Sequence, residues 1–157
     1  MFGILNAEEI EDFLSKNLVG HLGCHFQGKT YIVPISYVYD KGFVYAHTKE
    51  GMKVNFLRQD PRVCFEVDLQ EDMANWKSVI TWGEFEELND EPLRTEALNK
   101  LASRILPLQS SQTTHLFPHW PFVPDDLTKI NGIVFRIRLT EKSGRFERPE
   151  PESTFAS

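Results

Sequence analysis

Four residues that follow a strand-like apolar run have the types and spacing to bind a phosphate group. His47, Thr48, Gly51 and Lys53 lie within VYAHTKEGMKVNF, where the run ends and a short helix is predicted over 50–58. A helix N-terminus presents backbone amides that have no partner in the helix, and a nearby cation adds to their attraction for an anion. Lys53 is therefore the best candidate phosphate ligand, although a solvated helix lysine would give the same pattern.

The cysteines and two closely spaced histidines indicate no further chemistry. Cys24 and Cys64 are not spaced as a CxxC pair, so we interpret both as buried reduced thiols of a cytosolic protein. His115 and His119 are four residues apart, as two metal ligands on one helix face would be. Pro118 lies between them and disfavours a helix, so we expect no metal site.

The composition indicates one globular domain that binds neither nucleic acid nor a membrane. The net charge of the 157 residues is −6 without a basic block, which argues against nucleic-acid binding. The apolar runs are shorter than the roughly 20 residues of a membrane span, and the N-terminus resembles no signal peptide. We expect a cytoplasmic protein with one domain over 1–146 and a flexible C-terminal tail over 147–157.

The hydrophobic pattern predicts a mainly β protein with a few helices. Asn6 and Glu9 form a capping-box pattern for a helix that ends near 16–17, and a third helix is predicted to start at Asp90 or Glu91. The predicted buried face of this third helix comprises Leu93, Ala97, Leu101 and Ile105. Strands are predicted over 18–26, 30–39, 42–47, 62–69, 76–88 and 130–139, with a polar loop over 70–75.

These strands follow one another mainly through turns, so we predict an antiparallel closed or split β-barrel with peripheral α-helices. Turns are predicted at 27–29 and 40–42. Pro34 inside a strand requires an edge position, a bulge or a missing hydrogen bond. Gly83 is the expected bend of the longest strand.

Short motifs in a fixed order resemble those of a known family. They are GHLG at 20–23, VPISY at 33–37, VYAH at 44–47, GMK at 51–53, DPRVCF at 60–65 and WKSV at 76–79. Over residues 1–145 the chain resembles the FMN-binding split barrels related to pyridoxamine 5'-phosphate oxidase. Among these it is most similar to the nitroimidazole-resistance flavoproteins.

The resemblance implies a homodimer with FMN at the interface between its subunits. It places the FMN phosphate at Thr48, Gly51 and Lys53, with Asn55 either supporting the phosphate or facing solvent. Contacts to the flavin ring are implied for Val33, Pro34, Ile35, Ser36 and Tyr37, unless this segment is an ordinary barrel strand with an edge proline. His47 would lie near the ring or the ribityl chain, or be structural.

Further contacts are implied from the partner subunit and from an irregular segment. Trp76, Ser78 and Val79 match the strand that forms the partner-subunit wall of the flavin pocket, whereas Trp76 could equally be a core or dimer contact. Trp120, in the aromatic and proline-rich segment 107–124, is a candidate for closing over the ring face.

The implied function is that of an FMN-dependent oxidoreductase acting on a small organic or nitro-aromatic substrate. No arginine-rich site for pyridoxamine phosphate is present, and Arg145 alone does not make one, so vitamin B6 oxidation is not implied. No catalytic residue is assigned, and His47 and Tyr37 are the nearest candidates for an acid or base. The alternative is a non-catalytic protein that stores or senses a flavin, or a haem held by a histidine.

Overall fold

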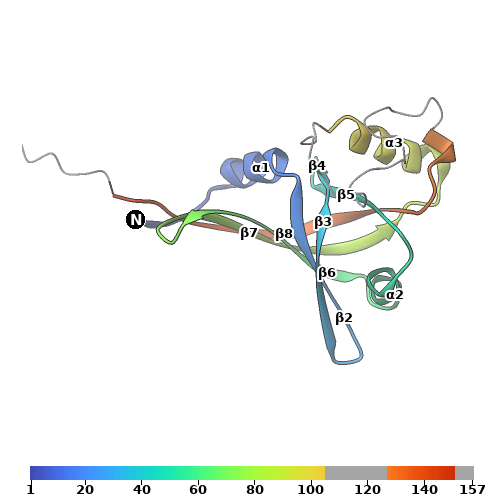
Figure 1. Cartoon of the computed structure of the whole chain (residues 1–157), viewed down its shortest axis with the longest axis horizontal. Helices are drawn as coiled ribbons and strands as arrows, with labels where there is room; N and C mark the ends of the chain where they lie inside the picture. Colours follow the sequence, from blue (N-terminus) through green and yellow to red (C-terminus); the bar gives the residue numbers. More distant parts are fainter. Residues whose placement is uncertain (105–126, 151–157) are drawn as a thin grey trace, which may run out of the picture.

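The computed structural model describes residues 1–104 and 127–150, which form one curved sheet with helices around it (Figure 1). The elements in chain order are β1 (Phe2–Ile4), α1 (Ala7–Lys16), β2 (Val19–Phe26), β3 (Lys29–Ser36), β4 (Val38–Asp40), β5 (Phe43–Thr48), α2 (Met52–Gln59), β6 (Arg62–Asp72), β7 (Asn75–Glu87), α3 (Glu91–Ala102), the 3₁₀ turn η2 (Leu127–Lys129) and β8 (Ile133–Glu147). No helix among the described residues is long and apolar enough to cross a membrane.

The sheet is an antiparallel split barrel, as the sequence predicts. Its strands follow the order β3-β2-β6-β7-β8-β5-β4, and β1 pairs with the C-terminal end of β8. The two edge strands, β3 and β4, are consecutive in the chain and are separated only by Tyr37. The predicted single strand over 30–39 is therefore wrong in one respect, because the chain leaves one edge of the sheet at Tyr37 and joins the other.

Local sequence signals explain several of these elements. The predicted capping box is confirmed, since the Glu9 amide donates to Asn6 Oδ1 (2.8 Å) and the Asn6 amide donates to Glu9 Oε1 (3.1 Å). Both predicted turns are confirmed, with positive φ at Gln27 and Gly28 in the first, and at the 41–42 pair in the second. Pro34 lies in an edge strand, where its missing N–H costs the ladder little.

The long strands β7 and β8 depart most from the prediction. The register between them shifts at Trp82 and Gly83, which confirms the expected bend. The last strand is predicted over 130–139 but runs from Ile133 to Glu147. Its second half is polar and lacks the alternation of apolar residues that predicts a strand, but it pairs with β7. Similarly, β6 and β7 extend into most of the predicted polar loop over 70–75.

The chain ends of the described fold lie side by side. The short strand β1, which the sequence analysis did not anticipate, pairs Phe2 with Glu147. The Arg148 amide then donates to the Met1 carbonyl (3.0 Å). The first two residues assigned to the tail are therefore tied to β1, whereas residues 151–157 lie outside the described residues.

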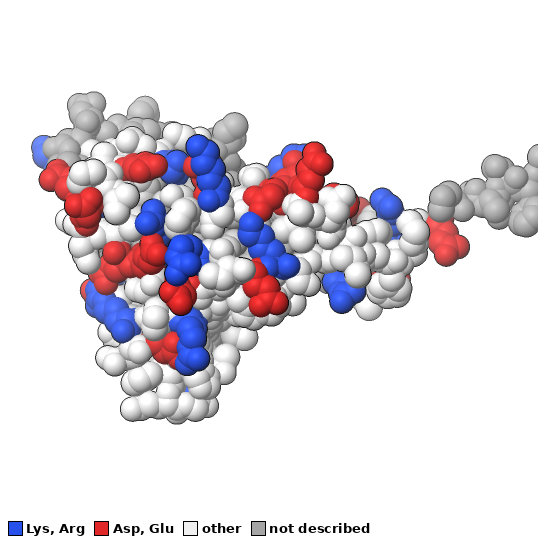
Figure 2. Space-filling view, turned by 180° about the vertical axis from the view of Figure 1, so that it is seen from behind, with Lys and Arg blue, Asp and Glu red and all other residues white. Residues whose placement is uncertain are grey.

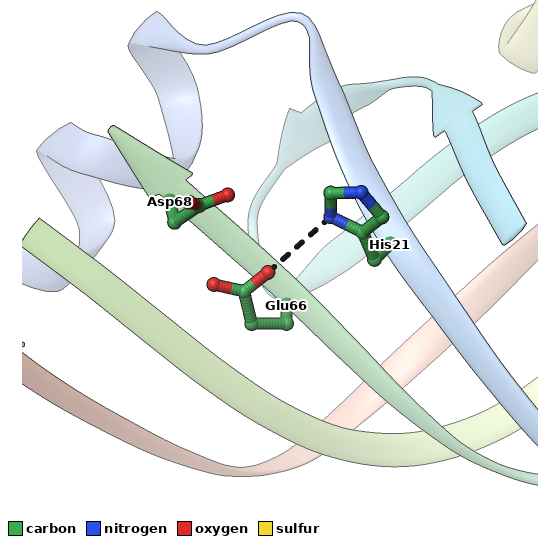
Figure 3. Close-up of side chains that lie close together, drawn as sticks. All are labelled: His21, Glu66 and Asp68. Carbon is green, nitrogen blue, oxygen red and sulfur yellow. Dashed lines mark ion pairs between the residues drawn. The ribbon is translucent and has the colours of Figure 1, made fainter. Parts of the chain in front are cut away.

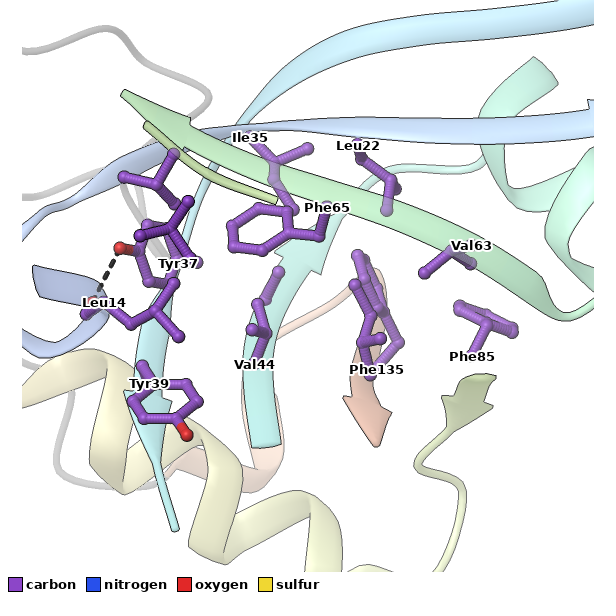
Figure 4. Close-up of a cluster of buried hydrophobic side chains, with 14 of the residues drawn as sticks. Leu14, Leu22, Ile35, Tyr37, Tyr39, Val44, Val63, Phe65, Phe85 and Phe135 are labelled. Atoms are coloured by element: carbon purple, nitrogen blue, oxygen red, sulfur yellow. Dashed lines mark hydrogen bonds between the residues drawn. The ribbon is translucent and has the colours of Figure 1, made fainter. Parts of the chain in front are cut away.

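The core fills the inside of the curved sheet (Figure 4). Leu14, Leu22, Phe65 and Phe135 are fully buried there, contributed by α1, β2, β6 and β8. Burial of such side chains contributes about 1.5–3 kcal/mol each. The Tyr37 hydroxyl is also buried and donates to the Leu14 carbonyl (2.7 Å), so it fastens α1 to the point where the barrel splits.

A second buried cluster lies under α3. The predicted buried positions Ala97 and Leu101 are confirmed, together with Leu98. Leu93 is 37% exposed, so its predicted burial is wrong. Each i+4 step advances about 40° around a helix, so a row of such steps drifts off the face that Ala97 and Leu98 define. Ile105 lies outside the described residues.

The surface carries both signs of charge. Figure 2 shows acidic and basic side chains interspersed over the visible face. Oppositely charged side chains also pair across β7 and β8, such as Arg136 with Glu86 (2.7 Å) and Arg138 with Glu84 (2.9 Å). Exposed pairs of this kind contribute little stability, about 0–1 kcal/mol each.

Candidate functional site

The N-terminus of α2 is open to a ligand. Its N-cap residue is Gly51, which has no side chain to cap the helix. A Cβ added at Gly51 would meet no atom within 4 Å, so the space beside the first turn is free of the atoms of this chain's described residues. The first amides of a helix have no carbonyl partner within it. The turn that leads into α2 therefore presents unpaired donors to open space.

Lys53, in the first turn of α2, is a half-buried cation. Burial lowers the pKa of its ammonium group, and the nearby Cys24 thiol opposes this effect. Within the described parts of the chain, no hydrogen bond or ion pair holds the Lys53 ammonium. A cation that loses part of its hydration without a partner is destabilised, and a bound anion would compensate it.

His47, at the end of β5, is held in one orientation. Its Nε2 lies 2.5 Å from the Asn131 carbonyl, and since a carbonyl oxygen only accepts, Nε2 carries the proton. Gly132, at φ +100°, packs against the ring, and a Cβ there would lie 2.8 Å from Nε2. Burial lowers the pKa of His47, and the charges of Arg94 and Arg104 lower it further. The neutral ring therefore keeps Nδ1 as an acceptor.

Two arginines that the sequence analysis missed make this region cationic. Arg94 donates to the carbonyls of Ile130 (2.6 Å) and Gly132 (3.3 Å), and so fixes the turn against which His47 packs. Arg104 donates to Ser36 Oγ at the end of β3, and burial lowers its pKa to about 10. Arg94 lies in α3 and Arg104 lies just after its C-terminus, far along the chain from the matched motifs, and no spacing rule in the sequence links them to β3 or β5.

Alternate residues of the VPISY segment face opposite ways. Pro34 is exposed on the outer face and lies opposite His21 of β2. Ile35 and Tyr37 are buried in the core, so only their backbone groups could contact a ligand at this edge. Val33 is half-buried and packs against the same core. Burial also raises the pKa of Tyr37, and its hydroxyl is already bonded, so it is unsuited to proton transfer.

The structure brings the first group of predicted residues together in one chain. The end of β5, with His47 and Thr48, leads directly into Gly51 and α2. Helix α2 packs beside β2 and β3, where Phe56 contacts Tyr31 with ring centroids 5.9 Å apart. Strand β3 also contacts β5. The β3 edge, the end of β5 and the start of α2 thus form one continuous region, which we call the phosphate end. Asn55, one turn into α2, is exposed.

The residues predicted on β7 lie elsewhere. The β6–β7 turn is at the left of Figure 1 and α2 is at the lower right. Trp76 donates through Nε1 to Glu147 Oε2 (2.9 Å), and Ser78 Oγ donates to Glu66 Oε1 (2.9 Å). Val79 is fully buried in the core and faces away from the outer surface. One chain alone does not bring Trp76 and Ser78 to the phosphate end.

The outer face of the sheet exposes apolar side chains. Ile32 is 65% exposed, and Ile80 and Trp82 are each 38% exposed. A hollow of about 650 Å³ lies on this face, with Ile32, Cys64 and Trp82 in its wall and His21 and Glu66 among its polar groups. Exposed apolar surface around a hollow is typical of an interface or a ligand site.

Three of the histidine and tryptophan predictions cannot be placed. Trp120, His115 and His119 fall within 105–126, outside the described residues. Both cysteines are free; Cys24 is buried, whereas Cys64 is only half-buried and contributes to the wall of the hollow. Burial raises the pKa of each thiol, which disfavours a nucleophilic role.

Comparisons with known proteins agree with this fold. A family model described as pyridoxamine 5'-phosphate oxidase matches residues 6–146. A solved FAD-binding protein of Mesorhizobium loti is 31% identical, superposes with a TM-score of 0.70, and the match covers 93% of this chain and 98% of that one.

Two further matches are more distant. A putative 5-nitroimidazole antibiotic resistance protein of Bacteroides thetaiotaomicron has a TM-score of 0.70 with coverage of 93% and 87%, but at 17% identity it shows only the shared fold. An uncharacterized protein of Rhizobium meliloti is 27% identical over 85 residues, which span 54% of this chain and only 56% of that relative.

Proposed function

Since the chain belongs to the pyridoxamine 5'-phosphate oxidase family, we propose that it is an FMN-dependent oxidoreductase that acts on a small organic or nitro-aromatic substrate. The observation that carries the proposal is the half-buried Lys53 beside the open N-terminus of α2, a cation that no hydrogen bond or ion pair of the described residues holds. Bound FMN would supply the electron or hydride transfer, and the protein would hold and orient it.

At the phosphate end, three kinds of donor lie close together along the chain, although the Thr48 hydroxyl donates to the Lys49 carbonyl (3.2 Å) in this structure. Lys53 supplies a charge, the amides at the start of α2 supply directed hydrogen bonds, and the Thr48 hydroxyl lies on the adjoining strand end. This combination suits a terminal phosphate, which accepts several charge-assisted hydrogen bonds at once.

Next to it, the β3 edge and His47 suit a flat polar ring. The backbone of β3 at Pro34–Ser36 belongs to an edge strand, so one side of it is free of the β2 ladder. The Nδ1 atom of His47 can accept a hydrogen bond from a donor on the ligand, while its Nε2–H stays bound to Asn131. His47 is then a positioning residue of the proposed site.

The proposed active unit is a homodimer with the cofactor between its subunits. Trp76 and Ser78 lie apart from the phosphate end in one chain, so a second chain is required for them to wall the same ligand. The exposed apolar residues of the outer sheet face, Ile32, Ile80 and Trp82, supply a surface that such a second copy would cover.

The experiment that tests the cofactor compares FMN with riboflavin, which has the same ring but no phosphate. Lys53→Ala should weaken FMN binding about 10- to 150-fold, the equivalent of roughly 1.5–3 kcal/mol for a hydrogen bond to a charged group. Riboflavin affinity should not change. Lys49→Ala removes an exposed lysine four residues earlier and is the matched control.

The readout is flavin fluorescence during titration of cofactor-free protein, with gel filtration of the loaded protein to test for a dimer. An equal loss of FMN and riboflavin affinity in Lys53→Ala would refute the phosphate assignment. Chromatography of the flavin released from the purified protein distinguishes FMN from FAD, which is the flavin named for the Mesorhizobium loti protein. A Soret band in the absorption spectrum would show that the protein binds haem and would refute the flavin assignment.

A non-catalytic flavin carrier is the second candidate. The hydroxyl of Tyr37 is buried and already donates to the Leu14 carbonyl, so of the two acid–base candidates only His47 keeps an atom, Nδ1, that could exchange a proton. This shortage of acid–base groups favours a carrier. Anaerobic reduction of the bound flavin by a nicotinamide donor, followed by reoxidation with a nitro-aromatic compound, distinguishes the two. A carrier would show no turnover above that of free flavin.

A further inference from the structure

His21, Glu66 and Asp68 form a compact cluster on the outer face of the sheet (Figure 3). His21 lies on β2 directly opposite Glu66 of β6, and Asp68 follows two residues later on the same face of β6. The register of two adjacent strands, rather than a flexible loop, therefore positions all three side chains.

The spacing of the ligand atoms suits one metal ion. One ligand atom from each residue lies within 4.8 Å of the other two. His21 Nδ1 and Glu66 Oε2 are 3.4 Å apart. Two ligands of a tetrahedral zinc with bonds of about 2.1 Å are separated by about 3.4 Å, so this pair already has the required spacing. The Asp68 carboxylate completes the set within the same 4.8 Å.

The charge and the second shell also suit a divalent cation. Two carboxylates and a neutral imidazole offset a charge of +2. Ser78 Oγ donates to Glu66 Oε1 (2.9 Å), which leaves Oε2 directed toward His21 (Figure 3). No lysine or arginine pairs with Glu66 or Asp68 in the described parts of the chain. The nearest cation in register is Arg145, on β8 opposite Ser78.

A separate observation gives the cluster an open side. His21 and Glu66 also belong to the lining of the hollow of about 650 Å³ that is walled by Ile32, Cys64 and Trp82. An ion held by three protein ligands keeps a position for water or for a ligand atom, as in zinc sites that bind substrates. The hollow adjoins that position and has room for more than a water molecule.

We propose that His21, Glu66 and Asp68 bind a divalent transition-metal ion, zinc being the best fit, with an open position toward the hollow. One imidazole with two carboxylates is a hard-to-borderline ligand set that suits zinc and excludes a thiolate-based site. The three ligands lie outside the phosphate end, so the ion can be titrated in flavin-free protein. The hollow belongs to the face that the proposed second copy would cover, so the open position would point into the subunit interface.

The test is titration of the full-length, chelator-treated protein with Zn²⁺ by calorimetry, and with Co²⁺ by absorption spectroscopy. The expected result is one ion per chain. His21→Ala and Asp68→Asn should each weaken binding at least tenfold, and Ser78→Ala should weaken it about 10- to 100-fold through the orientation of Glu66. His25→Ala is the matched control, since His25 is exposed on the same strand, lines the same hollow and hydrogen-bonds Thr30 Oγ1 (3.3 Å) rather than Glu66 or Asp68.

Three outcomes would overturn the proposal. The first is a metal affinity weaker than millimolar in the unaltered protein, and the second is a loss of affinity in His25→Ala equal to that in His21→Ala. The third is a thiolate-to-cobalt charge-transfer band, which would assign the metal to Cys64. Circular dichroism of each variant separates loss of the site from loss of the fold. Asp68→Asn keeps the shape of the exposed side chain and so tests the site with least disturbance.

Discussion

Replacing Gly83 with alanine tests the bend that shapes the sheet. Gly83 lies in β7 where the register with β8 shifts. A Cβ there would lie 2.3 Å from the Arg138 carbonyl oxygen, 2.9 Å from its carbonyl carbon and 3.0 Å from Leu139 Cα. All three atoms belong to backbone, so no side-chain rotation relieves the overlap, and the two central strands must separate.

The magnitude follows from the overlap. Ordinary contacts of a Cβ atom begin at 3.4 Å, so β8 must move by about 1 Å or lose local hydrogen bonds. Overpacking of this kind typically costs about 1–3 kcal/mol, and we expect Gly83→Ala to reach the upper end. For a chain of this size each kcal/mol lowers the melting temperature by about 2–4 °C.

Gly23→Ala is the matched control for the same chemical change. Gly23 lies on β2, where an added Cβ would meet Cys64 O at 3.6 Å, an ordinary contact. Its effect should stay within about 0.5 kcal/mol, or be slightly stabilising because alanine restricts the unfolded chain. Urea unfolding followed by circular dichroism measures both variants. The reasoning would be refuted by equal midpoints for Gly83→Ala and Gly23→Ala.

Two further predictions concern the split of the barrel and the orientation of His47. Tyr37→Phe leaves the Leu14 carbonyl without its buried donor and should cost about 1–3 kcal/mol in urea unfolding, whereas Tyr31→Phe, whose hydroxyl has no bond in the described structure, should cost less than half as much. The folded-state pKa of His47 is lowered, so the unfolded chain takes up a proton first as the pH falls below about 6.5. Stability should therefore decrease as the pH falls from about 6.5 through the folded pKa, and His47→Gln should flatten this dependence; an unchanged slope would show that His47 is not the group responsible.

Much of the fold could be predicted because local chemistry and tertiary structure agree. The capping box at Asn6, the turn at Gln27–Gly28 and the bend at Gly83 each depend on residues close in sequence. The second half of β8 could not be predicted in this way. Its residues Glu141 to Gly144 are small or polar, and they are strand only because β7 provides a partner for each of them.

In the candidate site, too, the residues that are close in sequence could be predicted, whereas those brought together by tertiary packing could not. The phosphate end could be predicted, since His47, Gly51 and Lys53 lie within one strand–helix connection. Arg104 and the turn at Asn131 could not, because they meet His47 and Ser36 only through the packing of α3. The His21–Glu66 pair was also missed, since it depends on the register between two strands more than 40 residues apart in the chain.

The position of β8 has a consequence for synthesis of the protein on the ribosome. β8 lies between β7 on one side and β5 and β1 on the other, and it is made after all three of these partners. Until it emerges, the nascent chain holds two separate pieces of sheet with unpaired edges, and Leu5 lacks the Gly144 carbonyl that its amide binds in the finished fold (3.0 Å). Completion of the barrel must therefore await synthesis of β8, and products truncated before Ile133 should be prone to aggregate or to require chaperones.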